Sequence, residues 1–262
     1  MLTQTGRAAA PLPLVETVGV APAVLAAAGL SDQVGVRVAA DPAGRGEVRF
    51  AAGARLLLRG GWAGAGCIQV VDLAGAELAP VAAMDPAAGL RRITGGERVA
   101  VVDDPVVVER AWHRGVLGTA AQLIGLARRM LSMTVEYVSS RRQFGVPVGS
   151  FQAVKHHLAT ALLQVEFAEP AVARAGFSLA TDDPHRDRDV ALAKALASEA
   201  AAAVARTALQ CHGAIGYTTE YDLHLFAKRA WALAAEWGSA AWHRARLAEH
   251  LGLPLRGTTP AH

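Results

Sequence analysis

The stretch that decides the fold is YVSSRRQFGVPVGSFQAVK, from Tyr137 to Lys155, together with LQCHGAIGY, from Leu209 to Tyr217. Each stretch ends an alanine-rich helical pattern, breaks at glycine and carries polar side chains at the break. From Asp104 onward, apolar residues recur at three- and four-residue spacing, which is typical of amphipathic helices. The pattern therefore predicts a helical region with candidate binding residues at the ends of its helices.

Four long helices with short connections are predicted, and such a pattern forms an antiparallel bundle. Asp104 followed by Pro105 is typical of a helix start, and the polar segment TDDPHRDRD is predicted to be a turn. The predicted helices cover residues 106–142, about 150–180, about 187–211 and about 220–251.

The first hundred residues have a different texture. Residues 1–30 begin with a proline-containing segment, followed by a predicted short helix that ends at Gly29. Residues 31–103 contain short apolar or alternating segments separated by glycine, proline and aspartate, which predicts a small β-rich domain. These strands are expected in VGVRVAA, EVRFAAG, ARLLLRG, CIQVVDL and RVAVVDD. The fold class is therefore mostly α with a small β domain, divided as 1–30, 31–103, 104–252 and a tail at 253–262.

Composition excludes several classes of protein. The 262 residues are 52% hydrophobic with a net charge of +3, which allows a sizeable core and suits an anionic ligand better than a nucleic acid. Cys67 and Cys211 form no disulfide framework, which fits a reduced, cytoplasmic setting. The opening lacks a signal-peptide pattern, and no apolar run of about 18 residues predicts a membrane span.

No metal or nucleotide-loop motif is apparent. His156 and His157 are adjacent and face different directions on a helix, unlike an i, i+4 ligand pair. The glycine-rich segment GWAGAG, at residues 61–66, lacks the helix and acidic residue that a phosphate loop requires, so it is predicted to be an ordinary loop.

The polar groups at the helix ends each admit two interpretations. Arg141 and Arg142 can complement a helix dipole, or their guanidinium forks can hold a phosphate. Gln152 can be solvated surface. Gly213 can be a helix cap or can let a ligand approach the backbone. His212 is more typical of a packed or capping histidine than of an acid–base group.

The order of these segments carries a resemblance. A long helix ends in R-x-Q-F-G, with F-Q about seven residues on, and then come Q-x-x-G-x-x-G-Y-T, E-Y and a final helix with K-R near its start. Over roughly 105–250 this resembles the C-terminal half of an acyl-CoA dehydrogenase. Residues 7–30 resemble the end of that family's N-terminal helical domain, and 31–103 its central β domain in reduced form. By this resemblance the N-terminal helical domain is largely missing.

The resemblance implies a cofactor, FAD. Arg141 and Phe144 would contact its adenosine-diphosphate part, with Gln152 nearby. Gln210, Gly213 and the following backbone at Ala214 would bind the pyrophosphate end. In this family such groups act across a subunit interface, so the resemblance implies an oligomer.

The departures from the family pattern concern the base. The family's glutamate precedes Gly-Thr or Gly-Ser, whereas this sequence has Trp237 before Gly238, with Glu236 one position early. One residue turns a helical side chain by about 100°, so Glu236 is either a displaced catalytic candidate or a solvated helix residue. The family's alternative base position corresponds to Gly115. The β domain also lacks the T-E-P-x-A-G-S-D-like and W-I-T/S-N-like strands, so we expect that this chain does not grip its own flavin ring.

Together these features predict one subunit of an FAD-dependent acyl-CoA dehydrogenase, which removes hydrogen from the α and β carbons of an acyl-CoA thioester. Some actinobacterial members, including those acting on steroid side chains, are heteromers of related subunits. The chain would help to bind FAD while a related dehydrogenase subunit supplies the base, and an electron-transfer flavoprotein is a candidate acceptor. The alternatives are a helical scaffold that has lost flavin, a self-sufficient homo-oligomer using Glu236, and a flavin monooxygenase of the same fold.

Overall fold

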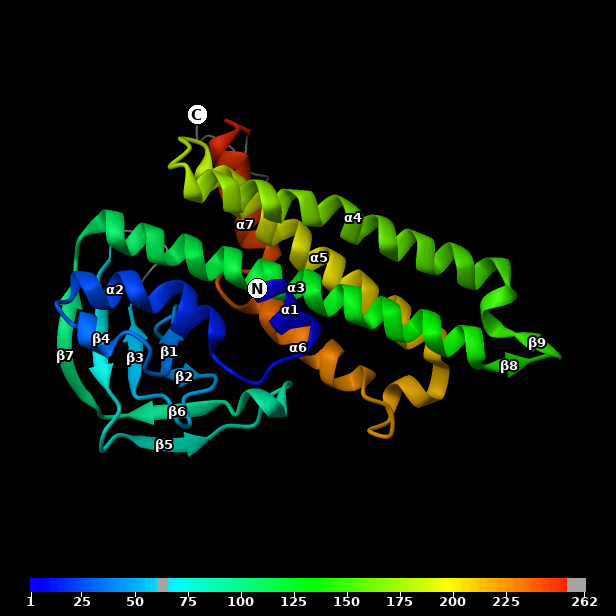
Figure 1. Cartoon of the computed structure of the whole chain (residues 1–262), viewed down its shortest axis with the longest axis horizontal. Helices are drawn as coiled ribbons and strands as arrows, with labels where there is room; N and C mark the ends of the chain where they lie inside the picture. Colours follow the sequence, from blue (N-terminus) through cyan, green and yellow to red (C-terminus); the bar gives the residue numbers. More distant parts are fainter. Residues whose placement is uncertain (61–65, 254–262) are drawn as a thin grey trace, which may run out of the picture.

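A computed structural model describes residues 1–60 and 66–253 as a long helical bundle with a small β region against one end (Figure 1). The fold class predicted from the sequence, mostly α with a small β domain, is confirmed. The helices are α1 (Leu2–Arg7), α2 (Ala21–Ala27), α3 (Pro105–Ser140), α4 (Gln152–Ala180), α5 (Arg186–His212), α6 (Leu223–Ala235) and α7 (Ala240–His250). Shorter turns are the π-helix η1 (Val15–Val20) and the 3₁₀ helices η2 (Ser31–Gln33), η3 (Pro86–Ala88), η4 (Val148–Ser150) and η5 (Gly213–Tyr217).

The longest helix, α3, begins as the sequence predicts. The Asp104 carboxylate accepts a hydrogen bond of 2.8 Å from the backbone N–H of Val106, and Pro105 occupies the first turn. An aspartate cap satisfies a backbone donor that has no partner inside the helix, and proline has no N–H to leave unpaired. These two residues therefore set the residue at which α3 begins.

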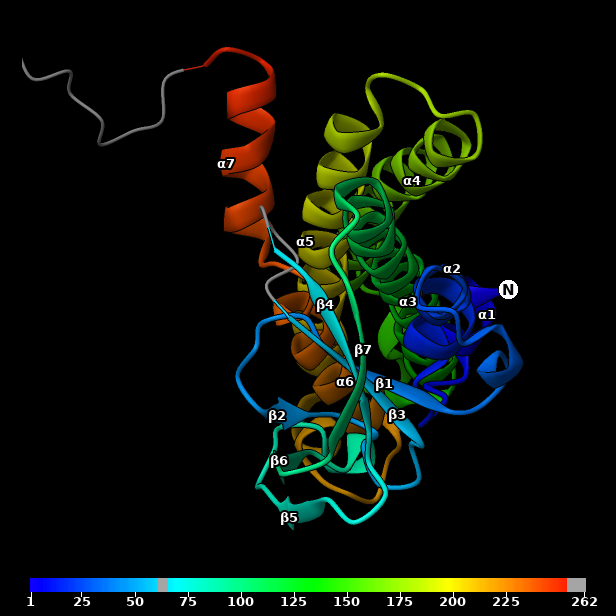
Figure 2. The same ribbon diagram turned by 90° about the vertical axis from the view of Figure 1, so that its left-hand side faces the viewer.

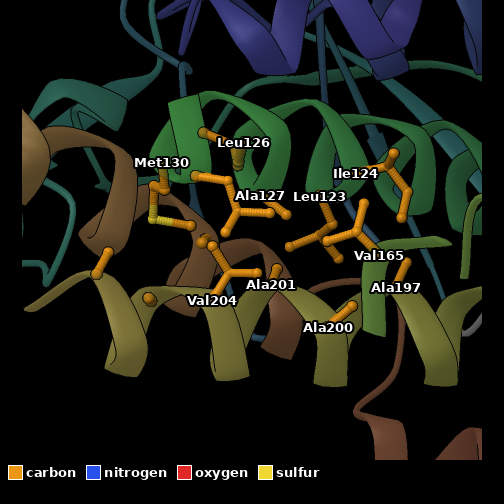
Figure 3. Close-up of a cluster of buried hydrophobic side chains, with 14 of the residues drawn as sticks. Leu123, Ile124, Leu126, Ala127, Met130, Val165, Ala197, Ala200, Ala201 and Val204 are labelled. Atoms are coloured by element: carbon orange, nitrogen blue, oxygen red, sulfur yellow. The ribbon is translucent and has the colours of Figure 1, made fainter. Parts of the chain in front are cut away.

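Alanine and small apolar residues let the bundle helices approach closely. Met130 and Leu123 on α3 pack against Ala201 and Val204 on α5, and Val165 of α4 joins the same core (Figure 3). Small side chains on one helix leave room for the larger ones opposite, which fills the interior to high density. Helices α3 and α5 therefore form the packed centre of the bundle.

The β region contains two small sheets (Figure 2). In the first, β1 (Val38–Asp41) pairs in parallel with β3 (Leu56–Arg59), which pairs antiparallel with β4 (Ile68–Asp72) and through it with β7 (Glu97–Val102). The second is antiparallel, in the order β2 (Glu47–Val48), β6 (Arg91–Thr94) and β5 (Glu77–Pro80). Buried residues of β1, β3, β4 and β7 share one core with α2, η1 and α3.

The N-terminal helices lie on α3. A Cβ atom on Gly125 of α3 would lie 2.0 Å from the Thr3 carbonyl oxygen, and one on Gly6 would lie 2.1 Å from the Gln122 carbonyl oxygen. Glycine at both positions therefore allows α1 to rest directly on the backbone of α3. Helix α2 ends before Gly29, which has φ +73° as expected for a helix-ending glycine.

Three predictions about elements are wrong. The fourth helix was expected to be continuous from about 220 to 251, but residues 236–239 interrupt it between α6 and α7. The first was expected to reach residue 142, but α3 ends at Ser140 and a hairpin follows, with strands β8 (Arg142–Gln143) and β9 (Val146–Pro147). Strands β5 and β6 were not predicted, because their alanine, proline and arginine content is not typical of strands. The predicted loop at 61–66 falls, except for Gly66, outside the described residues.

Candidate functional site

The hairpin after α3 carries the first group of predicted cofactor contacts. Phe144 and Gly145 form its two-residue turn with φ values of +52° and +81°, the backbone of a type I′ turn. Phe144 is 91% exposed, and its ring meets Phe151 edge-on at 6.2 Å between centroids. Arg141 is exposed at the end of α3, and within residues 1–60 and 66–253 its side chain has no hydrogen bond. The turn thus presents an aromatic ring and a guanidinium to solvent.

The end of α5 lies beside the end of α3. His212 stacks on Tyr137 with ring centroids 4.5 Å apart, and it also meets Tyr221 at 4.9 Å. His212 is buried, its Nδ1 donates to the Ala208 carbonyl oxygen at 2.8 Å, and burial lowers its pKa. The packing role predicted for this histidine is therefore what the structure contains.

The remaining predicted cofactor contacts are exposed at this same end of the bundle. Gln152 begins α4, Gln210 lies in the last turn of α5, and Gly213 and Ala214 begin η5. Gly213 has φ +63° and ψ −141°, and a Cβ added there would meet nothing within 4 Å. The structure therefore places all six residues (Arg141, Phe144, Gln152, Gln210, Gly213 and Ala214) at one end of the bundle with open access.

The turn between α6 and α7, residues 236–239, is a different site. Helix α6, 13 residues long, separates it from the η5 end by roughly 20 Å at 1.5 Å per residue. Trp237 is buried, and its backbone is in the left-handed region with φ +53°. A Cβ on Gly115 of α3 would lie 2.4 Å from the Trp237 ring. The indole therefore fills the space at Gly115, so the two base positions implied by the resemblance are in contact and neither carries a carboxylate.

A cavity of about 570 Å³ opens beside this turn. Its walls come from the η1 segment, the loop between β1 and β2, α3 and the 236–239 turn, and they include the half-buried rings of Trp112 and Trp242. Glu236 lines it, and the Nε atom of Arg49 lies 3.3 Å from the Glu236 carboxylate. The Glu236 side chain therefore faces the cavity, but an arginine already holds it.

A second carboxylate, Glu16, lines the same cavity from η1. Burial raises the pKa of the Glu16 carboxyl, and the negative charge of Glu236 adds to this effect. A hydrogen bond from the backbone N–H of Glu16 itself opposes it most strongly, followed by the positive charge of Arg49 and a hydrogen bond from the Trp237 side chain. Because the indole N–H is the only polar group of a tryptophan side chain, it is the donor in this hydrogen bond.

Two buried side chains hold the 236–239 turn. Lys194 of α5 is fully buried, and its Nζ donates to the Ala234 carbonyl oxygen at 3.1 Å and the Gly238 carbonyl oxygen at 3.0 Å. Burial lowers the pKa of Lys194 to about 7. His243 donates from Nε2 to the Trp237 carbonyl oxygen at 2.8 Å, and burial lowers its pKa to about 4, so the ring is neutral at pH 7. These bonds stabilise a backbone that tryptophan rarely adopts.

Sequence reasoning missed Glu16, Arg49 and Lys194. The first two stand alone in segments without periodic spacing, so no motif pointed to them. Lys194 carried a weak signal, because it is one of three lysines in the chain and lies in an alanine-rich helix. A charged residue on an otherwise apolar helix face indicates a buried partner.

One cluster has ligand-like composition but is an ion-pair network. Glu109, His113 and Asp187 place their polar atoms within 4.8 Å of one another. Arg186 Nη2 lies 3.1 Å from Glu109, and His113 Nε2 lies 3.1 Å from Asp187. An arginine that neutralises the carboxylates competes directly with a cation, so these contacts account for the cluster.

Comparison with known proteins identifies the family. The model of the acyl-CoA dehydrogenase C-terminal domain matches residues 106–252, which is more than half of the 262-residue chain. The chain belongs to the acyl-CoA dehydrogenase family. Acyl-CoA dehydrogenase IpdE2 of Mycobacterium tuberculosis is 41% identical over 151 residues, which are 58% of this chain and 44% of the relative. The chain thus spans less than half the length of this acyl-CoA dehydrogenase.

Two solved structures are similar over nearly the whole chain. The ChsE4–ChsE5 complex from Mycobacterium tuberculosis gives a TM-score of 0.80 at 25% identity, covering 99% of this chain and 80% of that one. A steroid ACAD named Tcur3481–Tcur3483 gives 0.80 at 22% identity, covering 96% and 79%; this likeness shows the fold alone. Among residues 1–60 and 66–253, no helix has the length and apolar character that crossing a bilayer requires.

Proposed function

We propose that this acyl-CoA dehydrogenase family member is one subunit of an FAD-dependent enzyme acting on an acyl-CoA thioester, and that a related subunit supplies the catalytic base. The proposal rests on the separation between the exposed candidate FAD contacts and the position where the family's base would lie. Exposed groups suited to a nucleotide lie at one end of the bundle, whereas the base position about one α6 length away is filled by Trp237.

The exposed end has the donors that a pyrophosphate requires. The Arg141 guanidinium offers paired N–H groups, and Gln152 and Gln210 offer amide donors. The backbone at Gly213 and Ala214 is open to a close approach, and the exposed Phe144 ring offers a flat apolar surface to an adenine. These residues would hold the adenosine-diphosphate part of FAD, and the bound flavin would supply the hydride acceptor.

The outer face of α4 supports an oligomer. Leu163, Phe167 and Phe177 are 54%, 72% and 57% exposed, and large exposed apolar side chains on one helix are typical of contact surfaces. The ChsE4–ChsE5 neighbour is a complex of two proteins by its own description. A hetero-oligomer of this kind would bring the exposed FAD contacts of this chain to a partner that holds the flavin ring and the base. The acyl group of the substrate is proposed to be lipid- or steroid-derived, and an electron-transfer flavoprotein is proposed as the acceptor.

The test is the flavin content of an assembly. The full chain would be co-expressed with an adjacent dehydrogenase-like gene product, and bound FAD per chain would be measured from the visible absorbance after purification. We expect about one FAD per two chains, and Arg141→Ala should lower this ratio. Arg244→Ala is the matched control, because Arg244 is an exposed arginine on α7 that pairs with Glu199. A colourless assembly would rule out the proposal, and flavin content unchanged by Arg141→Ala would favour a scaffold role.

A second candidate function is a self-sufficient homo-oligomer that uses Glu236. The observation in its favour is that Glu236 lines the 570 Å³ cavity. Dehydrogenation by the chain purified alone, abolished in Glu236→Gln, would establish this function instead. Oxygen consumption with reduced flavin would point to a monooxygenase.

A further inference from the structure

The cavity beside the 236–239 turn contains a carboxyl group that the proposed function does not use. Glu16 lies far from Glu236 in the sequence, yet both line this cavity together with Arg49. The volume of about 570 Å³ falls within the roughly 300–1,000 Å³ of small-molecule sites. The tryptophan rings of the wall offer apolar surface next to the charged groups.

Geometry distinguishes the two carboxylates. Glu236 is held by Arg49 at 3.3 Å and its side chain is 33% exposed, so its carboxylate already has a charged partner. Glu16 receives a hydrogen bond from the Trp237 indole, which fixes the carboxyl relative to the wall. Trp237 is itself held in place, because its indole fills the space at Gly115 and its backbone carbonyl oxygen accepts a hydrogen bond from His243.

The charge environment of Glu16 suits proton transfer. Burial and the nearby charge of Glu236 raise its pKa above the ordinary value of a glutamate, with a hydrogen bond from its own backbone N–H, Arg49 and Trp237 acting in the opposite direction. Asp41, Arg45 and Glu47 also line the cavity. A carboxyl whose pKa is moved toward neutrality exchanges protons more readily under working conditions than an ordinary glutamate.

We propose that Glu16 is the acid–base group of this chain's own cavity and that it removes a proton from the carbon next to the carbonyl of an acyl thioester bound there. The inference rests on the proposed function for the class of substrate, and it extends that function by giving this chain a proton-transfer centre of its own. The base of the partner would act in the partner's cavity, which the exposed end of this chain completes.

The step involves no oxidant. The C–H bond at the α carbon breaks, and the proton goes to a carboxylate oxygen of Glu16. The electron pair moves to the carbonyl oxygen as an enolate. The reverse step in heavy water returns a deuteron to the same carbon, so exchange can be followed without any redox reaction.

The experiment uses the full chain purified without a partner, so that no second subunit contributes a carboxylate. Acetoacetyl-CoA, whose C2 protons are acidic, would be incubated in heavy water, and the loss of its C2 proton signal would be followed by NMR against a protein-free sample. Glu16→Gln should lower the protein-dependent exchange by at least about 100-fold, as general acid–base groups contribute about 10²–10⁴. Glu199→Gln is the control, because Glu199 lies on α5 outside the cavity lining and pairs with Arg244, and it should leave the exchange unchanged.

A second variant separates proton transfer from a structural role. Trp237→Phe keeps an aromatic ring against Gly115 but removes the indole N–H, whose hydrogen bond lowers the pKa of Glu16. The exchange rate should rise with pH as Glu16 ionises, and in Trp237→Phe this rise should move to higher pH. Far-UV circular dichroism checks that each variant is folded.

Three results would overturn the inference. They are exchange no faster than in the protein-free sample, exchange unaffected by Glu16→Gln, and exchange abolished by Glu236→Gln alone. If Glu16→Gln does not fold, the pH dependence of the wild-type protein provides the test. A protein-dependent exchange rate that does not rise between about pH 5 and 8, the range above the ordinary glutamate pKa, also overturns the inference. Flavin content of the co-expressed assembly tests the proposed function independently, so the two failures are distinguishable.

Discussion

The contact between Trp237 and Gly115 can be measured by a double-mutant cycle. A Cβ added at Gly115 would lie 2.4–2.5 Å from three carbons of the Trp237 ring, a separation that forces a shift. Ala is better than Gly inside a helix by about 1 kcal/mol, but overpacking a buried site costs about 1–3 kcal/mol or more. Since the ring is clamped by its surroundings, we expect Gly115→Ala to lower the free energy of unfolding by about 1–2 kcal/mol.

The Trp237→Ala change removes the obstacle. Alone it should cost about 3–5 kcal/mol, as for other buried tryptophans. In that background, Gly115→Ala should instead stabilise by up to about 1 kcal/mol, because the added methyl enters the vacated space. The coupling energy between the two positions, the difference between these two effects of Gly115→Ala, is therefore expected to be about 1–3 kcal/mol.

The assay is urea denaturation followed by far-UV circular dichroism. Gly176→Ala is the matched control: Gly176 is a helical glycine in α4, and the nearest atom to an added Cβ, on Leu117, is 3.9 Å away. This control should gain up to about 1 kcal/mol. Additivity of Gly115→Ala and Trp237→Ala within about 0.5 kcal/mol, the behaviour of independent sites, would refute the reasoning.

Three further predictions follow from single features. Because burial lowers the pKa of Lys194 to about 7, the folded state binds fewer protons than the unfolded state above that pH. The free energy of unfolding should therefore increase as the pH rises from about 7 toward the pKa of lysine in the unfolded chain, about 10.4. Urea titrations at several pH values should show no such increase for Lys194→Met. Asp85→Asn removes the charge that pairs with the buried Arg229 and should cost about 3–5 kcal/mol in the same assay. Phe144→Gly relieves a left-handed backbone at φ +52° and should raise stability by about 1 kcal/mol while lowering the flavin content of the co-expressed assembly; an increase in Tm without loss of flavin would contradict the cofactor role.

The helices were predictable wherever local signals decide the structure. Asp104 and Pro105 marked the start of α3 correctly, and the long alanine-rich patterns placed α4 and α5 within one or two residues of their observed bounds. Because consecutive helices of a bundle run antiparallel, the ends of α3 and α5 lie at the same end, and the stacking of Tyr137 on His212 confirms this placement. The binding roles of the exposed residues there stay predictions.

The interruption between α6 and α7 was not predictable from local sequence. Ala235, Glu236 and Trp237 are all compatible with a helix, and only Gly238 hinted at a break. The turn is fixed by Lys194, which comes from α5 and takes two carbonyl oxygens. Such contacts between distant segments override propensity and leave no periodic trace in the chain.

The cavity was beyond sequence reasoning for the same reason. Glu16, Arg49 and Glu236 come from three separate segments and meet only after the β region has packed on the bundle. Their spacing in the sequence resembles no motif. Tertiary structure alone shows that Glu236, the candidate named from the family pattern, shares its surroundings with another carboxylate.

The distribution of tryptophans has a consequence for spectroscopy. Three of the five indoles in the chain, those of Trp112, Trp237 and Trp242, line the cavity within one aromatic cluster. Intrinsic emission is therefore weighted toward the junction of α6 and α7 and toward the β-facing end of α3. A heating curve recorded by fluorescence would report the loosening of that junction, whereas ellipticity would report the melting of the long helices, and a gap between the two midpoints would measure how independently the junction opens.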